Sequence, residues 1–167
     1  NKRADPKDAR GNFAFYQWIR DSLADNKRYD AFVRDVTTAS GDIKTHPAVA
    51  WYRQAKDTTT QMEDTAQLFL GQRLQCAQCH HHPFEKWSQQ DYYGFSAFFS
   101  TVTKKTTNVP GEDIIFTKRA EAQAVNIRTK QPVKPTGLGS PTLAIAPDDD
   151  PRQSLAEWIG SKEDPFF

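Results

Sequence analysis

The chain has only two cysteines and one methionine among its 167 residues, and nowhere does it run for about twenty apolar residues. Without such a run we expect no membrane-spanning helix in this segment. Cys76 and Cys79 lie so close together that a disulfide between them would close a loop too short to stabilise a fold. The formal net charge of +1 gives no general reason to expect binding to nucleic acid or to an anionic membrane.

The two cysteines belong to the run Cys76-Ala77-Gln78-Cys79-His80, which has the pattern C-x-x-C-H. This pattern is typical of the attachment of a c-type haem. Two thiols form thioethers with the haem vinyl groups, and the histidine that follows binds the iron from one face. We therefore expect one covalent haem c, with Cys76 and Cys79 as thioethers and His80 as the proximal axial ligand. Because such haems are attached outside the cytoplasm, we also expect a periplasmic or otherwise extracytoplasmic protein.

Three other interpretations of the motif remain open. A C-x-x-C pair also occurs in thiol oxidoreductases, but there it follows a strand, whereas here the apolar stripe Met62, Ala66, Phe69 and Leu70 predicts a helix before it. The match could also arise by chance. A zinc site would use both cysteines and two histidines, taken from His46, His80, His81 and His82. His80 occupies the one position that haem attachment requires, which favours haem.

The distal side of the iron is less well defined by the sequence. Met62 lies upstream of the motif, whereas many small cytochromes use a downstream methionine, and a core position would equally explain it. His46 is far enough along the chain to reach the opposite face. His82 is too close to His80 to round the ring edge, but it could lie beside the haem and orient a propionate. An open, five-coordinate iron would favour ligand binding or peroxidase chemistry.

The pattern of apolar residues predicts a mainly α fold, with several short helices around a covalently bound haem and a small β-hairpin in the C-terminal third. We expect a linker at residues 1–11, a helical haem-binding body at 12–101, an irregular β-containing part at 102–147, and a docking helix at 148–167 that starts a following domain. The hairpin would pair residues 114–117 with 124–128. Both ends of the chain are expected to continue in a longer protein.

Several segments around the motif resemble a known family. Besides residues 66–87 and 90–99, these are residues 26–34, 128–135 and 150–159. They are similar to large secreted proteins of planctomycetes whose core is a pair of domains of unknown function, numbered 1549 and 1553, often preceded by a separate cytochrome c domain. The resemblance covers nearly the whole chain and suggests that it spans the end of the first domain and the start of the second.

The resemblance implies a periplasmic setting and a haem on Cys76, Cys79 and His80. It also implies a role for His82, because the family carries a histidine there, followed by Pro-Phe. At the positions of His46 and Met62 the family usually has other residues, which weakens both as distal ligands. The family has no established reaction, so the resemblance implies a cofactor and a setting but no substrate.

The sequence thus predicts a monohaem c-type domain that transfers electrons to or from a redox partner protein, and it is more typical of an electron-transfer domain than of an independent enzyme. One alternative is a haem domain whose open distal site binds a small ligand or peroxide. The other is a zinc-stapled interaction module. A homodimer is compatible with the sequence, and no nucleic-acid partner is expected.

Overall fold

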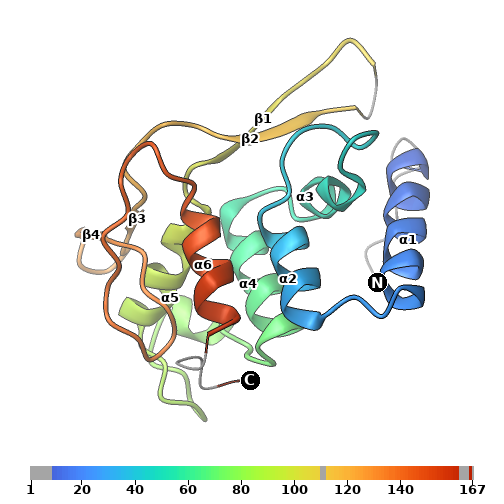
Figure 1. Cartoon of the computed structure of the whole chain (residues 1–167). Helices are drawn as coiled ribbons and strands as arrows, with labels where there is room; N and C mark the ends of the chain where they lie inside the picture. The colour runs from blue at the N-terminus through green and yellow to red at the C-terminus, as the bar shows by residue number, and fades with distance from the viewer. Residues whose placement is uncertain (1–8, 110–111, 162–165, 167) are drawn as a thin grey trace.

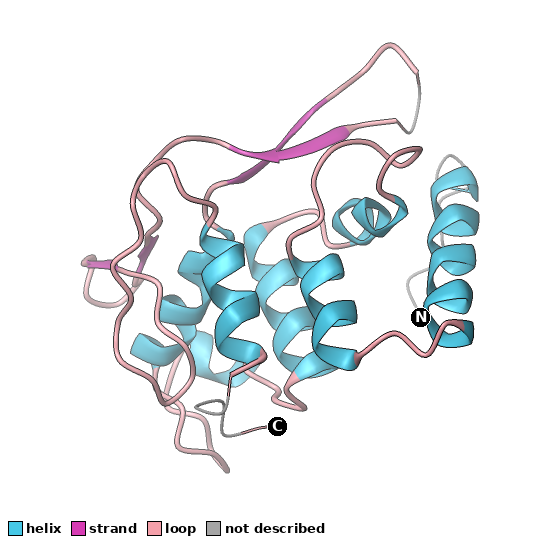
Figure 2. Cartoon of the chain, viewed as in Figure 1, coloured by secondary structure: helices cyan, strands magenta, loops and turns pink. Residues whose placement is uncertain are grey.

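The computed structural model describes residues 9–109, 112–161 and 166. Helices dominate the first two thirds of the chain, and long loops with short strands follow before a last helix (Figure 2). The fold is therefore mainly α, as the sequence predicted. No helix among the described residues is long and apolar enough to cross a membrane.

The α-helices are α1 (Ala9–Ala24), α2 (Tyr29–Thr37), α3 (Ala50–Gln54), α4 (Thr58–Phe69), α5 (Gln89–Ser96) and α6 (Pro151–Ile159). Short 3-10 turns are η2 (Pro47–Val49), η3 (Gln75–Gln78) and η4 (Ala97–Phe99). Helix α2 packs against α6, α4 against α5, and α1 against α3 and η2 (Figure 1).

The first helix begins inside the segment that the sequence predicted to be a linker. Gly11 indicated a break, yet it lies buried in α1. A Cβ atom at this position would lie 2.6 Å from Nη1 of Arg53 in α3, so the glycine allows the close approach of the two helices. The rest of the predicted linker, residues 1–8, lies outside the described residues.

Side-chain caps define where the other helices begin. Ser88 and Asp91 form the capping box of α5. Asp150 caps α6, and Pro151 occupies its first turn. The cap of α4 is Asp57, which accepts a hydrogen bond from the amide of Thr60.

Within the described residues the strands form two separate two-stranded sheets, so the predicted hairpin between residues 114–117 and 124–128 is wrong. Strand β2 (Ile114–Thr117) pairs antiparallel with β1 (Val102–Lys105), and β3 (Ala124–Val125) pairs with β4 (Pro132–Val133). The alternation that identifies a half-buried strand is missing in β1, where two partly buried residues precede two exposed lysines. For this reason the sequence did not identify β1 as a strand that could pair with β2.

One hydrophobic core joins the helices from α2 to α6. Its fully buried side chains include four aromatic residues of α5 and η4, Tyr92, Phe95, Phe98 and Phe99, which are at most 1% exposed. Leu155 and Ile159 of α6 belong to the same core as Val33 and Val36 of α2. The predicted docking helix is thus an integral part of the core, while residues 162–165 and 167 lie outside the described residues.

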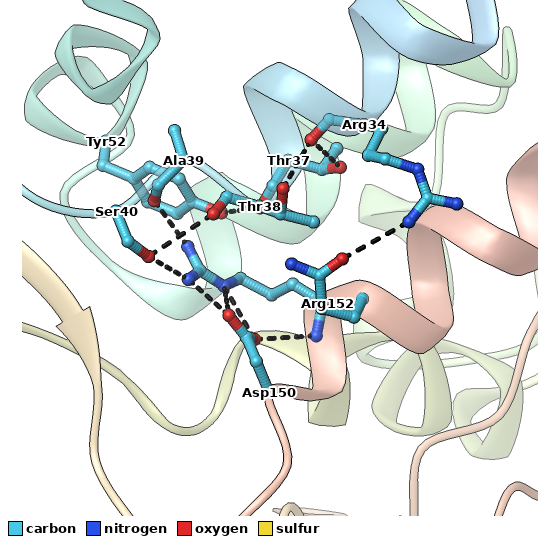
Figure 3. Close-up of polar contacts among 9 residues, drawn as sticks. Arg34, Thr37, Thr38, Ala39, Ser40, Tyr52, Asp150 and Arg152 are labelled. Atoms are coloured by element: carbon cyan, nitrogen blue, oxygen red, sulfur yellow. Dashed lines mark hydrogen bonds and ion pairs between the residues drawn. The ribbon is translucent and has the colours of Figure 1, made fainter. Parts of the chain in front are cut away.

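A buried arginine fastens α6 to the end of α2 (Figure 3). The side chain of Arg152 is 0% exposed and donates to the carbonyl of Ala39 at 2.9 Å and to Ser40 Oγ at 2.7 Å. It also forms an ion pair with Asp150 at 2.7 Å, and its guanidinium lies 5.1 Å from the ring centroid of Tyr52. The buried guanidinium therefore has an acidic partner, two further hydrogen-bond acceptors and an aromatic ring around it.

Candidate functional site

The C-x-x-C-H motif lies in the segment between α4 and α5, at the end of the helices opposite the β1–β2 sheet (Figure 1). Cys76 is in η3 and Cys79 directly follows it, with its amide donating to the carbonyl of Cys76 at 3.4 Å. Side chains three residues apart eclipse one another in a 3-10 turn. The two thiols therefore lie on the same side of the turn, and both are exposed and not in a disulfide.

Buried side chains hold this turn in place from below. Leu74 and Ala77 are 0% exposed and pack in the core, which directs the cysteines outward. The carbonyl of Gln78 accepts hydrogen bonds from Gln89 Nε2 at 2.8 Å and from the Tyr93 hydroxyl at 3.4 Å, so two residues of α5 fix the middle of the motif. The sequence did not identify these two partners, since neither residue type at this spacing signals a contact.

His80 has a single defined tautomer in this arrangement. Its Nδ1 lies 2.6 Å from the backbone carbonyl of His81. A carbonyl oxygen has no proton to give, so Nδ1 must donate, and the lone pair of the neutral ring is on Nε2. The ring is exposed. A hydrogen bond from one ring nitrogen to a carbonyl is how proteins orient a histidine that binds a metal through the other.

His82 contacts the backbone of the residues that follow it. Its Nδ1 accepts hydrogen bonds from the amides of Phe84 at 3.3 Å and Glu85 at 3.0 Å, and its own amide donates to the carbonyl of Trp87 at 2.9 Å. Because Nδ1 accepts, the proton of the neutral ring is on Nε2. His81 is exposed.

Tyr93 connects the motif with the β3 segment. Burial raises the pKa of the Tyr93 phenol, while the backbone of Ile127 hydrogen-bonds it and the nearby Cys79 thiol adds a small further increase. The phenol thus stays a hydrogen-bond donor under ordinary conditions, which suits its contact with Gln78.

The two predicted distal ligands do not gather at the motif. Met62 is 0% exposed within α4 and packs in the hydrophobic core. His46 is exposed and lines a pocket of about 460 Å³ with Trp18 and Asp35, next to η2, which packs against α1, α2 and α3. The motif instead packs against α5. The structure therefore places His46 beside η2 and Met62 in the buried core, whereas Cys76, Cys79 and His80 are exposed at the motif.

The residues at the motif fit a covalent haem better than a zinc ion. Among the described residues, no three His, Cys, Asp or Glu side chains gather where they could hold a metal ion. A structural zinc needs four such ligands, whereas a haem iron already has its ring nitrogens and needs one protein ligand on a given face. Two exposed thiols on one side of a turn, followed by an imidazole with a free Nε2, meet that requirement.

In a comparison with known protein families, the family model described as "PSCyt2: Protein of unknown function (DUF1549)" matches residues 1–104. No curated protein and no solved structure matches the chain.

Proposed function

The chain belongs to the PSCyt2 family of proteins of unknown function (DUF1549), and from that premise we propose that it is a monohaem c-type domain that transfers electrons. In this proposal Cys76 and Cys79 carry the haem and His80 is its proximal ligand. The domain would act outside the cytoplasm, with a redox protein or a neighbouring domain as its partner.

The hydrogen bond from His80 Nδ1 to the carbonyl of His81 carries the proposal. It leaves Nε2 as the free base on an exposed ring, directly after two exposed thiols on one side of a turn. A hydrogen bond of this kind orients the ring and leaves Nε2 as the nitrogen that can bind iron.

The attachment balances without an oxidant. Each thiol adds across one vinyl double bond: the sulfur bonds to one carbon, the thiol hydrogen goes to the other, and the double bond becomes single. Once bound, the haem supplies a one-electron couple between ferric and ferrous iron. The chain holds the sulfurs through Leu74 and Ala77 and orients His80 through the His81 carbonyl.

A second candidate function is the binding of a small ligand or peroxide at an open distal site. The burial of Met62 and the position of His46 beside η2 favour it, because neither residue lies at the motif. A high-spin ferric spectrum that shifts on addition of cyanide would support this candidate. A low-spin spectrum that ignores cyanide would support plain electron transfer.

The test is expression of the chain in a host that matures c-type cytochromes, followed by a pyridine haemochrome spectrum. We expect a thioether-linked haem that survives denaturation and is absent from the Cys76→Ser/Cys79→Ser double variant. In the absorption spectrum of the native protein, His80→Ala should shift the haem bands because the iron loses its proximal nitrogen, whereas His81→Ala keeps the backbone carbonyl and should leave the bands unchanged. Colourless protein with two titratable thiols would refute the proposal.

A further inference from the structure

A closed loop of six residues, 82–87, follows the C-x-x-C-H motif. The amide of His82 donates to the carbonyl of Trp87 at 2.9 Å and closes it, while His82 Nδ1 accepts from the amides of Phe84 and Glu85 inside it. One histidine thus satisfies backbone groups along the whole loop. At the far end, Trp87 is 4% exposed and donates from Nε1 to Gln72 Oε1 at 2.9 Å, which ties the loop to the body.

The tip of this loop presents a phenylalanine to solvent. The Phe84 side chain is 91% exposed, the highest value among the exposed large hydrophobic residues described. Aromatic side chains normally bury most of their area, since exposure of that surface to water is unfavourable. A loop whose backbone is fixed by three hydrogen bonds and whose apolar tip is uncovered is built to place that ring against something else.

The position of the loop indicates what covers the ring. Phe84 is four residues after His80, so its Cα lies within about 14 Å of that of the iron ligand, whatever the path of the chain. Val125 and Ile127 are 57% and 50% exposed, and helix α5 packs against both η3 and β3. The backbone of Ile127 hydrogen-bonds the Tyr93 hydroxyl, which lies near Cys79. The segment that carries these two exposed apolar side chains is therefore linked to the motif through α5, on whose surface a large flat apolar group attached to the thiols would find apolar partners.

We propose that His82 is a positioning residue, which holds the 82–87 loop so that the ring of Phe84 packs on the haem carried by Cys76 and Cys79. The inference rests on the proposed function and adds a specific contact to it. His82 acts through Nδ1 and the backbone of the loop, not as an iron ligand. Its Nδ1 already accepts two amide hydrogens, and its Nε2 carries the proton in the neutral ring.

The experiment uses the whole chain labelled with 4-fluorophenylalanine and observed by fluorine NMR. The chain has eleven phenylalanines, and the signals of Phe84 and Phe13 are assigned by their loss in Phe84→Leu and Phe13→Leu. Phe13 is the matched control, because it is 64% exposed and lies on α1, which packs against α3 and η2. Each sample is measured with ferric haem attached and as the haem-free Cys76→Ser/Cys79→Ser variant.

We expect the Phe84 signal to shift and broaden in the haem-containing protein, because ferric iron is paramagnetic, and the Phe13 signal to stay in place. If haem is attached but the Phe84 signal is the same with and without it, this inference is wrong and the proposed function stands. Absence of attached haem in the haemochrome spectrum would reject both.

Two substitutions test the role of His82. In His82→Asn the side-chain oxygen can accept from the amides two and three residues ahead, as in an Asx turn, so the Phe84 signal should keep its haem-dependent shift. In His82→Ala no acceptor remains, and the shift should decrease or vanish. If Asn behaves like Ala, the imidazole Nε2 rather than the backbone clamp is the important group, and the positioning role is refuted.

Discussion

Replacing Arg152 by alanine should be among the most destabilising single changes in this chain. The guanidinium is fully buried and has Asp150, Ala39 and Ser40 as its partners. Its removal leaves the carbonyl of Ala39 and the carboxylate of Asp150 without their main donor in a poorly solvated place. Removing one member of a buried ion pair costs about 3–5 kcal/mol. For a chain of this size roughly 2–4 °C is lost per kcal/mol, so the Tm should fall by about 6–20 °C.

Thermal and urea unfolding followed by circular dichroism would measure this effect. The matched control is Arg119→Ala, since Arg119 also faces an aspartate, Asp148 at 3.4 Å, but both side chains are exposed. That variant should unfold close to the unchanged protein, because exposed pairs contribute little. A loss of less than about 1 kcal/mol in Arg152→Ala would refute the view that the buried charge fastens α6 to α2.

Four further substitutions have expected outcomes of their own. Burial raises the pKa of Tyr52 to about 12, above its usual value near 10, so the folded state favours the neutral phenol. The contribution of this group to the free energy of unfolding is fully present below about pH 10 and should decrease as the pH rises toward 12. In urea unfolding at a series of pH values, Tyr52→Phe should therefore lose less stability over this range than the unchanged protein. His46→Ala and Met62→Leu should leave the absorption spectrum of the haem protein unchanged, because neither residue lies at the motif; a change from low spin to high spin would make the altered residue a ligand. Gly137→Ala should lower stability by about 1–3 kcal/mol in urea unfolding, because a Cβ atom there would lie 2.7 Å from Cε2 of Trp158, and unchanged stability would show that the indole can move.

The sequence identified the helices wherever a cap or an apolar stripe was strong. Ser88 and Asp91 define the start of α5, and Asp150-Pro151 that of α6, because caps act within three residues and are visible in the sequence. The sheets were harder to predict, since β1, the partner of β2, does not show the alternation of a half-buried strand. Gly11 was misleading because its role in α1 depends on Arg53, which is over forty residues away.

At the candidate site the sequence predicted the residues of the motif but not how they are held. The pattern C-x-x-C-H identified Cys76, Cys79 and His80, whereas the fixed tautomer of His80 depends on a backbone carbonyl that no residue type encodes. The role of His82 in closing the 82–87 loop also depends on backbone groups. A sequence shows which side chains can donate or accept hydrogen bonds. Which backbone amide or carbonyl groups they meet depends on the fold and is known only from the structure.

Helices α2 and α6 share one core, and this affects the design of truncated versions of the chain. A fragment that stopped at residue 104, the last residue matched by the family model, would lack Leu155, Trp158 and Ile159, and the surface of α2 and η4 that they cover would be open to water. Such a fragment is a candidate for aggregation during purification. Recombinant work on this chain is best done with α6 retained.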